Sequence, residues 1–348
     1  MKNLEIRKLT PETPLRVPES LSHAATFTAL DSWTGLVREI YGYETHRFEA
    51  VEDGEVAGIL ALTHVRHPIF GNYLATSPFG SYGGFAYSSI EARDGLLEHA
   101  RELANNLEAE QVNVRFEAME EENPPEGWVL HPVYSTYRIE LMLEAEKILA
   151  GFGSDHRNHI RKSLKKNFSV RFGCLDLLED AYEGLARSMH ELGSPYHGKP
   201  YLRRMAEALG DALEFVTMYD ARGGLAGSGV FITQGDVAAN LHANILRKYR
   251  ADYAGEFLYW SVLERFARKG LRLLDLGRSL NGSGNERFKM KWKPRKIPLA
   301  YWYYLPKGGN IPELNQRSPK FQFAIWTWKR LPSFAVRMIG PHLIRGIV

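Results

Sequence analysis

Residues 275–293, DLGRSLNGSGNERFKMKWK, are the stretch around which the rest of the chain is interpreted. The apolar run LRLLDL at 271–276 leads into it and is typical of a buried strand. A loop rich in glycine and serine follows. Four cations then stand at alternate positions, Arg287, Lys289, Lys291 and Lys293. Such a loop at the carboxyl end of a strand can present N–H groups and basic side chains to an anionic ligand or a developing oxyanion. A solvated basic loop after an edge strand gives the same pattern, and the spacing leaves both interpretations open.

Length and composition indicate a globular chain with two domains. The chain has 348 residues, of which 44% are hydrophobic and 24% charged. Its net charge of +3 does not by itself imply nucleic acid, but three acid-free basic segments, 157–171, 287–296 and 317–348, indicate a discrete anionic partner. The single cysteine, Cys174, excludes an intrachain disulfide and fits a buried small hydrophobe better than a nucleophile.

The terminal and apolar segments bear on where the protein works. The first twenty residues contain no apolar core of a signal peptide, and no run reaches the ~18 apolar residues of a membrane-spanning helix. We therefore expect a cytoplasmic protein, with peripheral attachment to the inner membrane as an open alternative. The twelve histidines show no metal-ligand spacing; we interpret His156 and His159 as surface groups and predict no metal.

Hydrophobic periodicity and turn residues predict alternating helices and strands. Helices are expected at 27–42, 88–108, 154–167, 178–192, 200–210 and 255–269. Strands are expected within 48–65 as a hairpin turning at Asp53-Gly54, and at 111–116, 134–143, 170–174, 213–220, 225–233, 237–245, 271–276 and 298–305. In strand 237–245 the alternation puts Asn240, His242 and Asn244 on one face, which predicts either the wall of a polar cleft or a solvated sheet surface.

Two segments 169 residues apart resemble each other. GEVAGILALT (54–63) and GGLAGSGVFI (223–232) share glycine, alanine and glycine at the same places. Each is followed by a predicted strand, helix and strand. The matching order of elements favours an internal duplication.

Six stretches together resemble a known family. They are SPFGSYGGF (77–85), RNHIRKSLKKN (157–167), HELGSPYHGKPYLRRM (190–205), LHANILRKYR (241–250), LDLGRSLNGSGNERFKMKW (274–292) and FAIWTWKRLPSFAVRMIGPHLIRG (323–346). With them the chain resembles the FemAB/FemX family of tandem-GNAT aminoacyltransferases, and most closely the FemAB-like proteins associated with exosortase (PEP-CTERM) and exopolysaccharide systems.

The resemblance implies an α/β (α+β) fold of two tandem GNAT-like subdomains with mixed sheets. We expect the first at 1–145 and the second at 146–305. A basic amphipathic helical tail at 306–348 would follow, packed on the first subdomain or on an anionic membrane surface.

The resemblance also implies a function: transfer of an acyl or aminoacyl group onto an amine of a cell-envelope, peptidoglycan or exopolysaccharide precursor. The donor would be aminoacyl-tRNA or an acyl thioester on coenzyme A or acyl-carrier protein, with no tightly bound cofactor. The acceptor would carry a diphosphate, with tRNA and the membrane surface as further partners. Two alternatives stay open, a non-catalytic recognition protein for a diphosphate-linked glycan precursor and an acyl-CoA-dependent GNAT N-acyltransferase acting on a small amine.

The residues expected at the site follow from the resemblance and from the polar strand. Lys289 would stabilise the oxyanion, and His242 is a candidate to remove the proton of the amine. The expected substrate-binding residues are Tyr82, Gly83, Gly84, Arg157, Arg161, Lys162, Asn240, Asn244, Arg250, Arg278, Ser279 and Phe288. The sequence departs from the family pattern at Arg115, which stands where founding members have an acid, and between Arg250 and Gly255, where the spacing of an acetyl-CoA pyrophosphate loop is absent.

Overall fold

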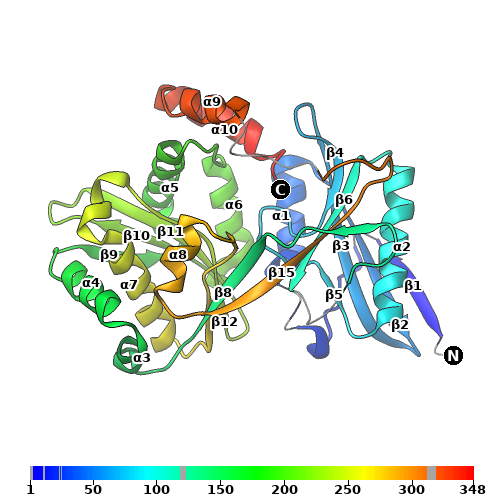
Figure 1. Ribbon diagram of the computed structural model, residues 1–348, viewed down its shortest axis with the longest axis horizontal. Coiled ribbons are helices and arrows are strands. Elements are labelled where there is room, and N and C mark those ends of the chain that lie inside the picture. Colours follow the sequence, from blue (N-terminus) through cyan, green and yellow to red (C-terminus); the bar gives the residue numbers. More distant parts are fainter. Residues whose placement is uncertain (1–2, 11, 23, 25, 118–122, 312–318) are drawn as a thin grey trace. The chain divides into compact units, whose positions relative to one another are not determined.

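The computed structural model describes residues 3–10, 12–22, 24, 26–117, 123–311 and 319–348. The chain forms two compact units (Figure 1). The first comprises Met1–Tyr134, Ile297–Glu313 and Arg345–Val348, and the second comprises Ser135–Lys296 and Leu314–Ile344. Mixed sheets and helices build both units, as the expected fold class requires.

The first unit contributes six neighbouring strands to the β-structure of the chain. Its strand order is β1 (Leu4–Leu9), β2 (Thr45–Glu52), β3 (Glu55–His67), β4 (Gly71–Ala75), β6 (Gln111–Glu117) and β15 (Arg295–Tyr304). Strands β4 and β6 pair in parallel. The short strands β5 (Phe85–Tyr87) and β7 (Trp128–Leu130) pair with β3 and β15, and the helices are α1 (Asp31–Tyr41) and α2 (Ile90–Asn106).

The second unit repeats this order. Its strands follow as β9 (Ser169–Gly173), β10 (Leu213–Tyr219), β11 (Leu225–Gln234), β12 (Val237–Ile245), β13 (Leu273–Asp275) and β8 (Tyr134–Glu140), with β14 (Ser279–Leu280) beside β8. Strands β12 and β13 pair in parallel. Its helices are α3 (Ala145–Gly151), α4 (Ser154–Leu164), α5 (Leu178–Leu192), α6 (Lys199–Leu209), α7 (Ala254–Arg268), α8 (Gly284–Met290), α9 (Pro319–Trp328) and α10 (Ser333–Ile344).

The sixth strand of each sheet comes from the other half of the sequence. Strand β15 follows the second unit along the chain but pairs with β6 of the first. Strand β8 ends the first stretch of sequence but pairs with β13 of the second. The expected boundaries at 145 and 305 therefore differ from the observed breaks after 134 and 296, because a contiguous cut assigns each of these strands to the wrong sheet.

The duplicated motif falls on a β-bulge in both sheets. In the first, Ala50 pairs with Gly58 and Val51 with Val56, which leaves Ala57 as the extra residue. In the second, Met218 pairs with Gly227 and Tyr219 with Leu225, which leaves Ala226. A bulge increases strand twist, and small residues allow the close approach it needs. The shared Ala-Gly pair thus marks the same local geometry twice.

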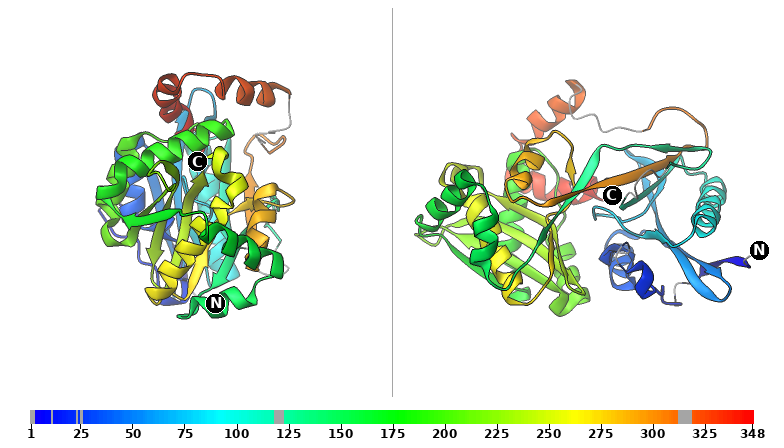
Figure 2. Two further views of the ribbon diagram at one scale, coloured as in Figure 1. Left: turned by 90° about the vertical axis from the view of Figure 1, so that its left-hand side faces the viewer. Right: turned by 60° about the horizontal axis from the view of Figure 1, so that its bottom comes forward.

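Helices cover both faces of the second sheet (Figure 2). On one face Ser228 of β11 donates to the Ala181 carbonyl of α5. On the other, Phe231 of β11 contacts Phe266 of α7, and α7 with α3 and α4 closes the main core of this unit. The core of the first unit lies between its sheet and α2.

The ends of three helices differ in their local chemistry. Helix α4 begins with Ser154, and Gly153 before it supplies no side-chain cap. Ser89 caps α2 by accepting from the Ala92 N–H. Pro341 lies inside α10. The short elements β4, β5, β7, α3, α8 and β14 were not predicted, because each is too brief to show a periodic pattern.

The tail helices contact the second unit. The Trp328 indole N–H donates to the Ser194 carbonyl at 3.1 Å, and Arg337 forms an ion pair of 2.6 Å with Glu183 of α5. Within the tail, residues 306–311 and 345–348 group with the first unit, where Tyr73 donates to the Gly346 carbonyl. The tail's helices therefore group with the second unit, whereas the sequence predicted packing on the first subdomain or on a membrane surface. Within the described residues, no helix is both long and apolar enough to cross a bilayer.

Candidate functional site

The parallel strands β12 and β13 stay together over only three residue pairs. The pairs run from Val237–Leu273 to Ala239–Asp275, and β12 then continues to Ile245. Beyond Ala239, no described strand pairs with this edge of β12. The main-chain groups on that edge are therefore available to an extended ligand.

A bulge in β12 separates the three polar residues that alternation puts together. Val230 of β11 pairs with His242, and Phe231 pairs with Asn240, so Leu241 is an extra residue. Because an extra residue reverses the alternation, Asn240 faces α7, where its side chain donates to the Tyr259 hydroxyl at 2.8 Å. His242 and Asn244 face α5 instead. The predicted single polar face is wrong.

His242 lies among aromatic rings. Its ring is 5.4 Å from Tyr196 and 6.0 Å from His197, and Nε2 is buried without a hydrogen-bond partner. Burial lowers the pKa of His242 to about 4, so the imidazole is neutral at physiological pH. Asn244 contacts Met189 Sδ at 3.5 Å on the same face. The structure thus brings His242 and Asn244 together and leaves Asn240 on the opposite side.

The basic string 287–293 is partly helical, so its cations do not share one side. Arg287 and Lys289 are two residues apart in α8, which turns them to opposite faces. Arg287 is exposed, whereas only 3% of Lys289 is exposed. The Lys289 ammonium donates to the carbonyls of Gly277 at 2.8 Å and Arg278 at 2.9 Å. Burial lowers the pKa of Lys289 to about 7, against the opposing effect of Asp275.

The glycine-rich loop forms the cap of α8. Ser283 accepts from the Glu286 N–H at 3.1 Å, and the Glu286 carboxylate accepts from the Gly282 N–H. This pattern is close to a capping box, except that the carboxylate accepts from the residue before the N-cap and not from the N-cap itself. Those two N–H groups are engaged within the loop, so they do not form the expected anion cradle.

Asp275 and Glu286 are two organising carboxylates that sequence reasoning missed. Asp275 is buried and accepts from Thr136 at 2.6 Å and from the Gly277 N–H at 2.7 Å. Glu286 accepts from Tyr137 and Lys296, and the Lys296 hydrogen bond is the largest cause lowering the pKa of Glu286 to about 2. Asp275 could have been found as an acid at the end of an apolar strand. Glu286 could have been found from the S-x-x-E spacing with Ser283, which is typical of a helix start.

The other residues expected near Lys289 have structural contacts. Phe288 packs on Tyr259 of α7 with ring centroids 5.4 Å apart. Ser279 is buried and accepts from Asn285 at 3.0 Å. Arg278 is half-buried, and its carbonyl accepts from Lys289. These residues form one cluster around the end of β13.

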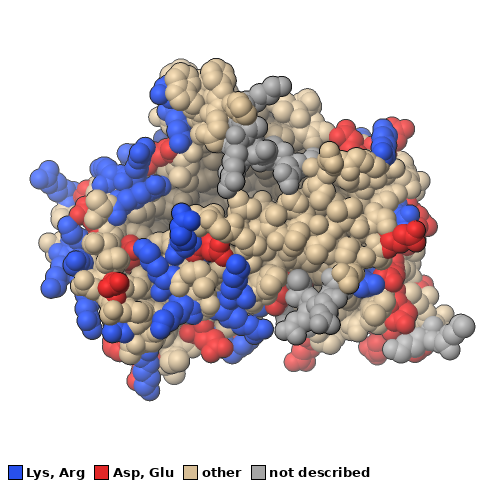
Figure 3. Space-filling model, viewed as in Figure 1, with Lys and Arg blue, Asp and Glu red and all other residues tan. Residues whose placement is uncertain are grey.

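The basic residues of α4 have different roles. Arg157 turns back and donates to the carbonyls of Phe152 and Ala150 near the end of α3. Arg161 and Lys162 are exposed, as is Arg250 after β12. Figure 3 shows cations gathered over this unit. Arg157 therefore satisfies carbonyl groups at the end of α3, whereas Arg161 and Lys162 are accessible to a ligand.

The Tyr82–Gly84 segment lies in the first unit and is engaged there. The Tyr82 carbonyl accepts from Thr26 at 2.7 Å, and its ring belongs to a buried cluster with Tyr301. A Cβ on Gly83 would come within 2.2 Å of Thr26, and Gly83 has a φ of 110°. Glycine is required here for local packing.

The first unit also contains a polar cavity of about 390 Å³. It is lined by Tyr41, Gly42, Tyr43, Glu44, His64, Arg66, Leu107 and Arg345. None of the residues expected from the sequence lines it. Arg115, where founding family members have an acid, is buried nearby in the sheet and donates to the Val348 carbonyl at 2.6 Å.

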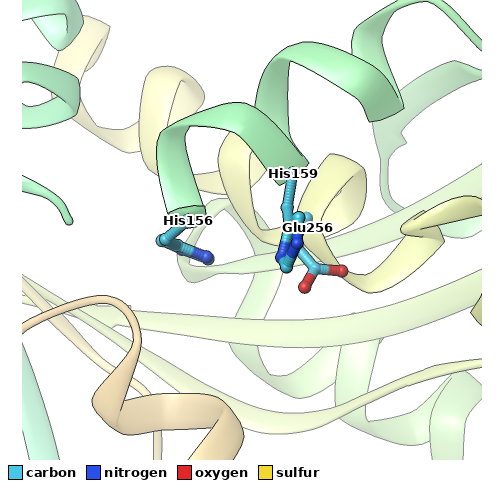
Figure 4. A group of neighbouring side chains, drawn as sticks. All are labelled: His156, His159 and Glu256. Carbon is cyan, nitrogen blue, oxygen red and sulfur yellow. The ribbon is translucent and has the colours of Figure 1, made fainter. Parts of the chain in front are cut away.

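His156 is not the surface group that was expected. It is 5% exposed, and it groups with His159 and with Glu256 at the start of α7 (Figure 4). In the described part of the chain, these three residues are of the types that bind metals and lie close enough together to share one ion.

Comparisons with known proteins agree with this architecture. The acetyltransferase (GNAT) domain family matches residues 154–290. Among solved structures, FemX is similar over 90% of this chain and 100% of its own, with a TM-score of 0.65 and 13% identity. No curated protein matches the sequence.

Two further solved structures are similar to most of this chain. A tandem GNAT protein from the clavulanic acid biosynthesis pathway covers 88% of this chain and 100% of its own, with a TM-score of 0.55 and 14% identity. L-PGS from Bacillus licheniformis covers 88% and 91%, with a TM-score of 0.52 and 12% identity. At such identities the likeness establishes the fold. The chain therefore has the tandem GNAT fold, with its family-matched GNAT domain in the second unit.

Proposed function

We propose that the protein transfers an acyl or aminoacyl group from an activated donor to an amine and forms an amide. The tandem GNAT fold, the match of 154–290 to an acetyltransferase domain and the likeness to FemX support this class of reaction. Following the FemAB-like resemblance, we assign the acceptor to a cell-envelope or exopolysaccharide precursor of the kind associated with exosortase systems.

The unpaired edge of β12 carries the proposal. Past Ala239, none of the strands in the described residues pairs with this edge, while β11 pairs with the other edge as far as Ile245. An extended chain with amide groups can add to such an edge by main-chain hydrogen bonds. The pantetheine arm of a thioester and an aminoacyl chain both have that chemistry, and the donor carbonyl would lie along β12.

The chemistry needs few protein groups. The amine lone pair attacks the donor carbonyl, the tetrahedral intermediate collapses, and the C–S or C–O bond to the carrier breaks while the amine loses a proton. Lys289 uses two donors on backbone carbonyls and retains a third for a substrate oxygen. With a pKa of about 4, His242 is a weak base, so we assign it positioning of the amine by the free Nε2 acceptor, with proton loss to solvent or to the carrier.

An anionic partner is favoured by exposed cations. Arg161, Lys165, Lys293 and Arg295 are exposed and make no ion pair with any described residue. A diphosphate or tRNA backbone would be held by such groups. The same surface supports the second candidate, a recognition protein for a diphosphate-linked glycan precursor that performs no transfer.

The tail supports contact with a membrane surface. Phe323, Trp326, Phe334 and Met338 are between 51% and 72% exposed on α9 and α10, and Arg330 lies over the Trp326 ring. Apolar side chains next to cations suit the headgroup region of anionic bilayers. We expect co-sedimentation with phosphatidylglycerol vesicles to fall in a Phe334→Ser/Met338→Ser variant. The matched control is Ile69→Ser, which removes an equally exposed apolar group from the first unit. Equal sedimentation of all three proteins would contradict membrane contact.

The transferase proposal is tested by donor consumption. Purified protein is incubated separately with aminoacyl-tRNA, acetyl-CoA, long-chain acyl-CoA and acyl-carrier protein, with cell-extract amines as acceptors, and donor loss is followed by mass spectrometry. We expect one donor class to be consumed. The Lys289→Gln variant removes the charge and retains an amide donor on a side chain one atom shorter, so we expect the rate to fall by about 100-fold or more.

The matched control is Lys147→Gln, which removes an exposed lysine of α3 and is expected to leave the rate unchanged. Wild-type activity should also fall as the pH rises through about 7, where Lys289 loses its proton. Binding of a nucleotide- or lipid-linked glycan with no turnover of any donor would favour the recognition protein instead.

A further inference from the structure

A histidine pair and a glutamate converge between α4 and α7 in the second unit. His156 and His159 are three residues apart, which puts them on one side of α4. Glu256 comes from the first turn of α7. One ligand atom from each residue lies within 4.8 Å of those of the other two. Figure 4 shows the three side chains directed toward a common space.

The imidazoles lack hydrogen-bond partners despite their burial. Both ring nitrogens of His156, and Nδ1 of His159, are inaccessible and unpaired. A buried polar group without a partner costs about 1–3 kcal/mol, so such groups call for an explanation. A bound ion that uses their lone pairs would supply the missing interaction.

The surrounding rings fix the imidazoles without using their nitrogens. His156 packs edge-on against Trp292, with ring centroids 4.5 Å apart, and also contacts Phe152. His159 stacks on Tyr253 at 4.4 Å. These contacts restrict both side chains to orientations that point toward Glu256. Packing therefore explains where the rings lie but not why two imidazoles meet a carboxylate.

We infer that His156, His159 and Glu256 bind a single divalent transition-metal ion of the Zn²⁺ class. Two imidazoles and one carboxylate match the ligand preference of zinc, whereas Mg²⁺ and Ca²⁺ require more oxygen ligands. Three protein ligands leave a fourth position for water or for an oxygen of a bound molecule. Zinc bonds of about 2.0–2.2 Å require the ligand atoms to close in by side-chain rotation.

Lys291 is the competing cation. Its ammonium lies 3.5 Å from Glu256 Oε1 and its side chain is 44% exposed, so it can move into solvent when the ion binds. The ion would join the basic helix α4 to the beginning of α7, which follows the free edge of β12 through residues 247–252. Its role is to fix these two helices, and it does not depend on the proposed acyl transfer.

The test uses the tag-free full chain, stripped with a chelator and titrated with ZnCl₂ by calorimetry. We expect one Zn²⁺ per chain and a rise in thermal midpoint on binding, since a ligand of the native state stabilises it. Co²⁺ should give the visible absorption of a four-coordinate site. Mg²⁺ should give neither signal.

Variants identify the ligands. His159→Gln and Glu256→Gln should each weaken Zn²⁺ binding more than about 100-fold, beyond the 10- to 100-fold typical of an outer-shell partner. His99→Gln, in α2 of the first unit, is the matched histidine control and should bind as wild type does. Circular dichroism of each apo variant checks folding. The inference would be overturned if the wild type did not bind Zn²⁺ at 1:1. It would also be overturned if folded His159→Gln and Glu256→Gln bound Zn²⁺ as tightly as the wild type.

Discussion

At the Nζ of Lys289, two backbone carbonyls take the place of the water that surrounds an exposed ammonium. The two hydrogen bonds fix the end of β13 at Gly277 and Arg278. Burial still disfavours the charged form, and the Asp275 carboxylate compensates only in part. Lys289 therefore combines a structural role with a charge that is lost near neutral pH.

This shift gives stability a pH dependence. The folded pKa of Lys289 is about 7 and the unfolded one 10.5, so between these values the unfolded chain binds more protons and stability rises with pH. From pH 7 to 9 we expect the wild type to gain about 2 kcal/mol relative to Lys289→Gln, at roughly 1.4 kcal/mol per pKa unit. Urea unfolding of both proteins at the two pH values measures the difference. If the free energy of unfolding changed equally with pH in both proteins, Lys289 would not be held neutral in the folded state.

At the scale of the elements, the bulges decide which side chains meet. The bulge at Leu241 moves Asn240 away from His242, and those at Ala57 and Ala226 mark the repeat. Gly227 beside the second of these has no room for a side chain: a Cβ would lie 2.8 Å from the Asn244 carbonyl oxygen. The contact joins β11 to the part of β12 with the free edge.

We expect Gly227→Ala to lose about 1–3 kcal/mol of unfolding free energy, because the clash is with main chain that cannot rotate away. Gly151→Ala at the end of α3 is the control, since its Cβ would meet no atom within 4 Å. Chemical denaturation of the two variants measures the difference. Equal stability of Gly227→Ala and Gly151→Ala would contradict this prediction, because it would mean that β11 and β12 can move apart at Gly227.

At the scale of the whole molecule, each sheet depends on a strand from the other half of the sequence. β15 pairs with both β6 and β7, and β8 pairs with β13. The ladder from Leu299 to Tyr304 places Trp302 and Ala300 in the first core. The units are thus not equivalent to the two sequence halves.

A fragment consisting of residues 1–145 should therefore fail to unfold cooperatively, since it lacks β15 and leaves β6 with an open edge. Joining residues 295–311 to residue 134 through a flexible linker should restore a cooperative transition. Thermal melts followed by circular dichroism compare the two chains. A cooperative melt of 1–145 alone, near that of the linked chain, would show that β15 is dispensable.

The sequence by itself determined the fold class and most of the long elements. Helix 178–192 and the meander of β10, β11 and β12 agree with their predicted ranges within one or two residues, because periodic apolar patterns and glycines with positive φ at Gly193 and Gly235 act locally. The Asp53-Gly54 turn was predicted for the same reason. The repeat was visible because its bulges require small residues.

Only the tertiary structure decided the arrangement of the candidate site. A one-residue bulge reverses alternation with no change in composition, so Asn240 could not be separated from His242 by pattern. His156 is buried against Trp292 and meets Glu256, one hundred residues away in α7. Lys289 likewise lies by the Tyr137 ring of β8, which is distant in sequence. The pairing of β15 with β6, and of β8 with β13, likewise has no local sequence signal. Which strands pair depends on how the whole core packs and not on residues adjacent in sequence.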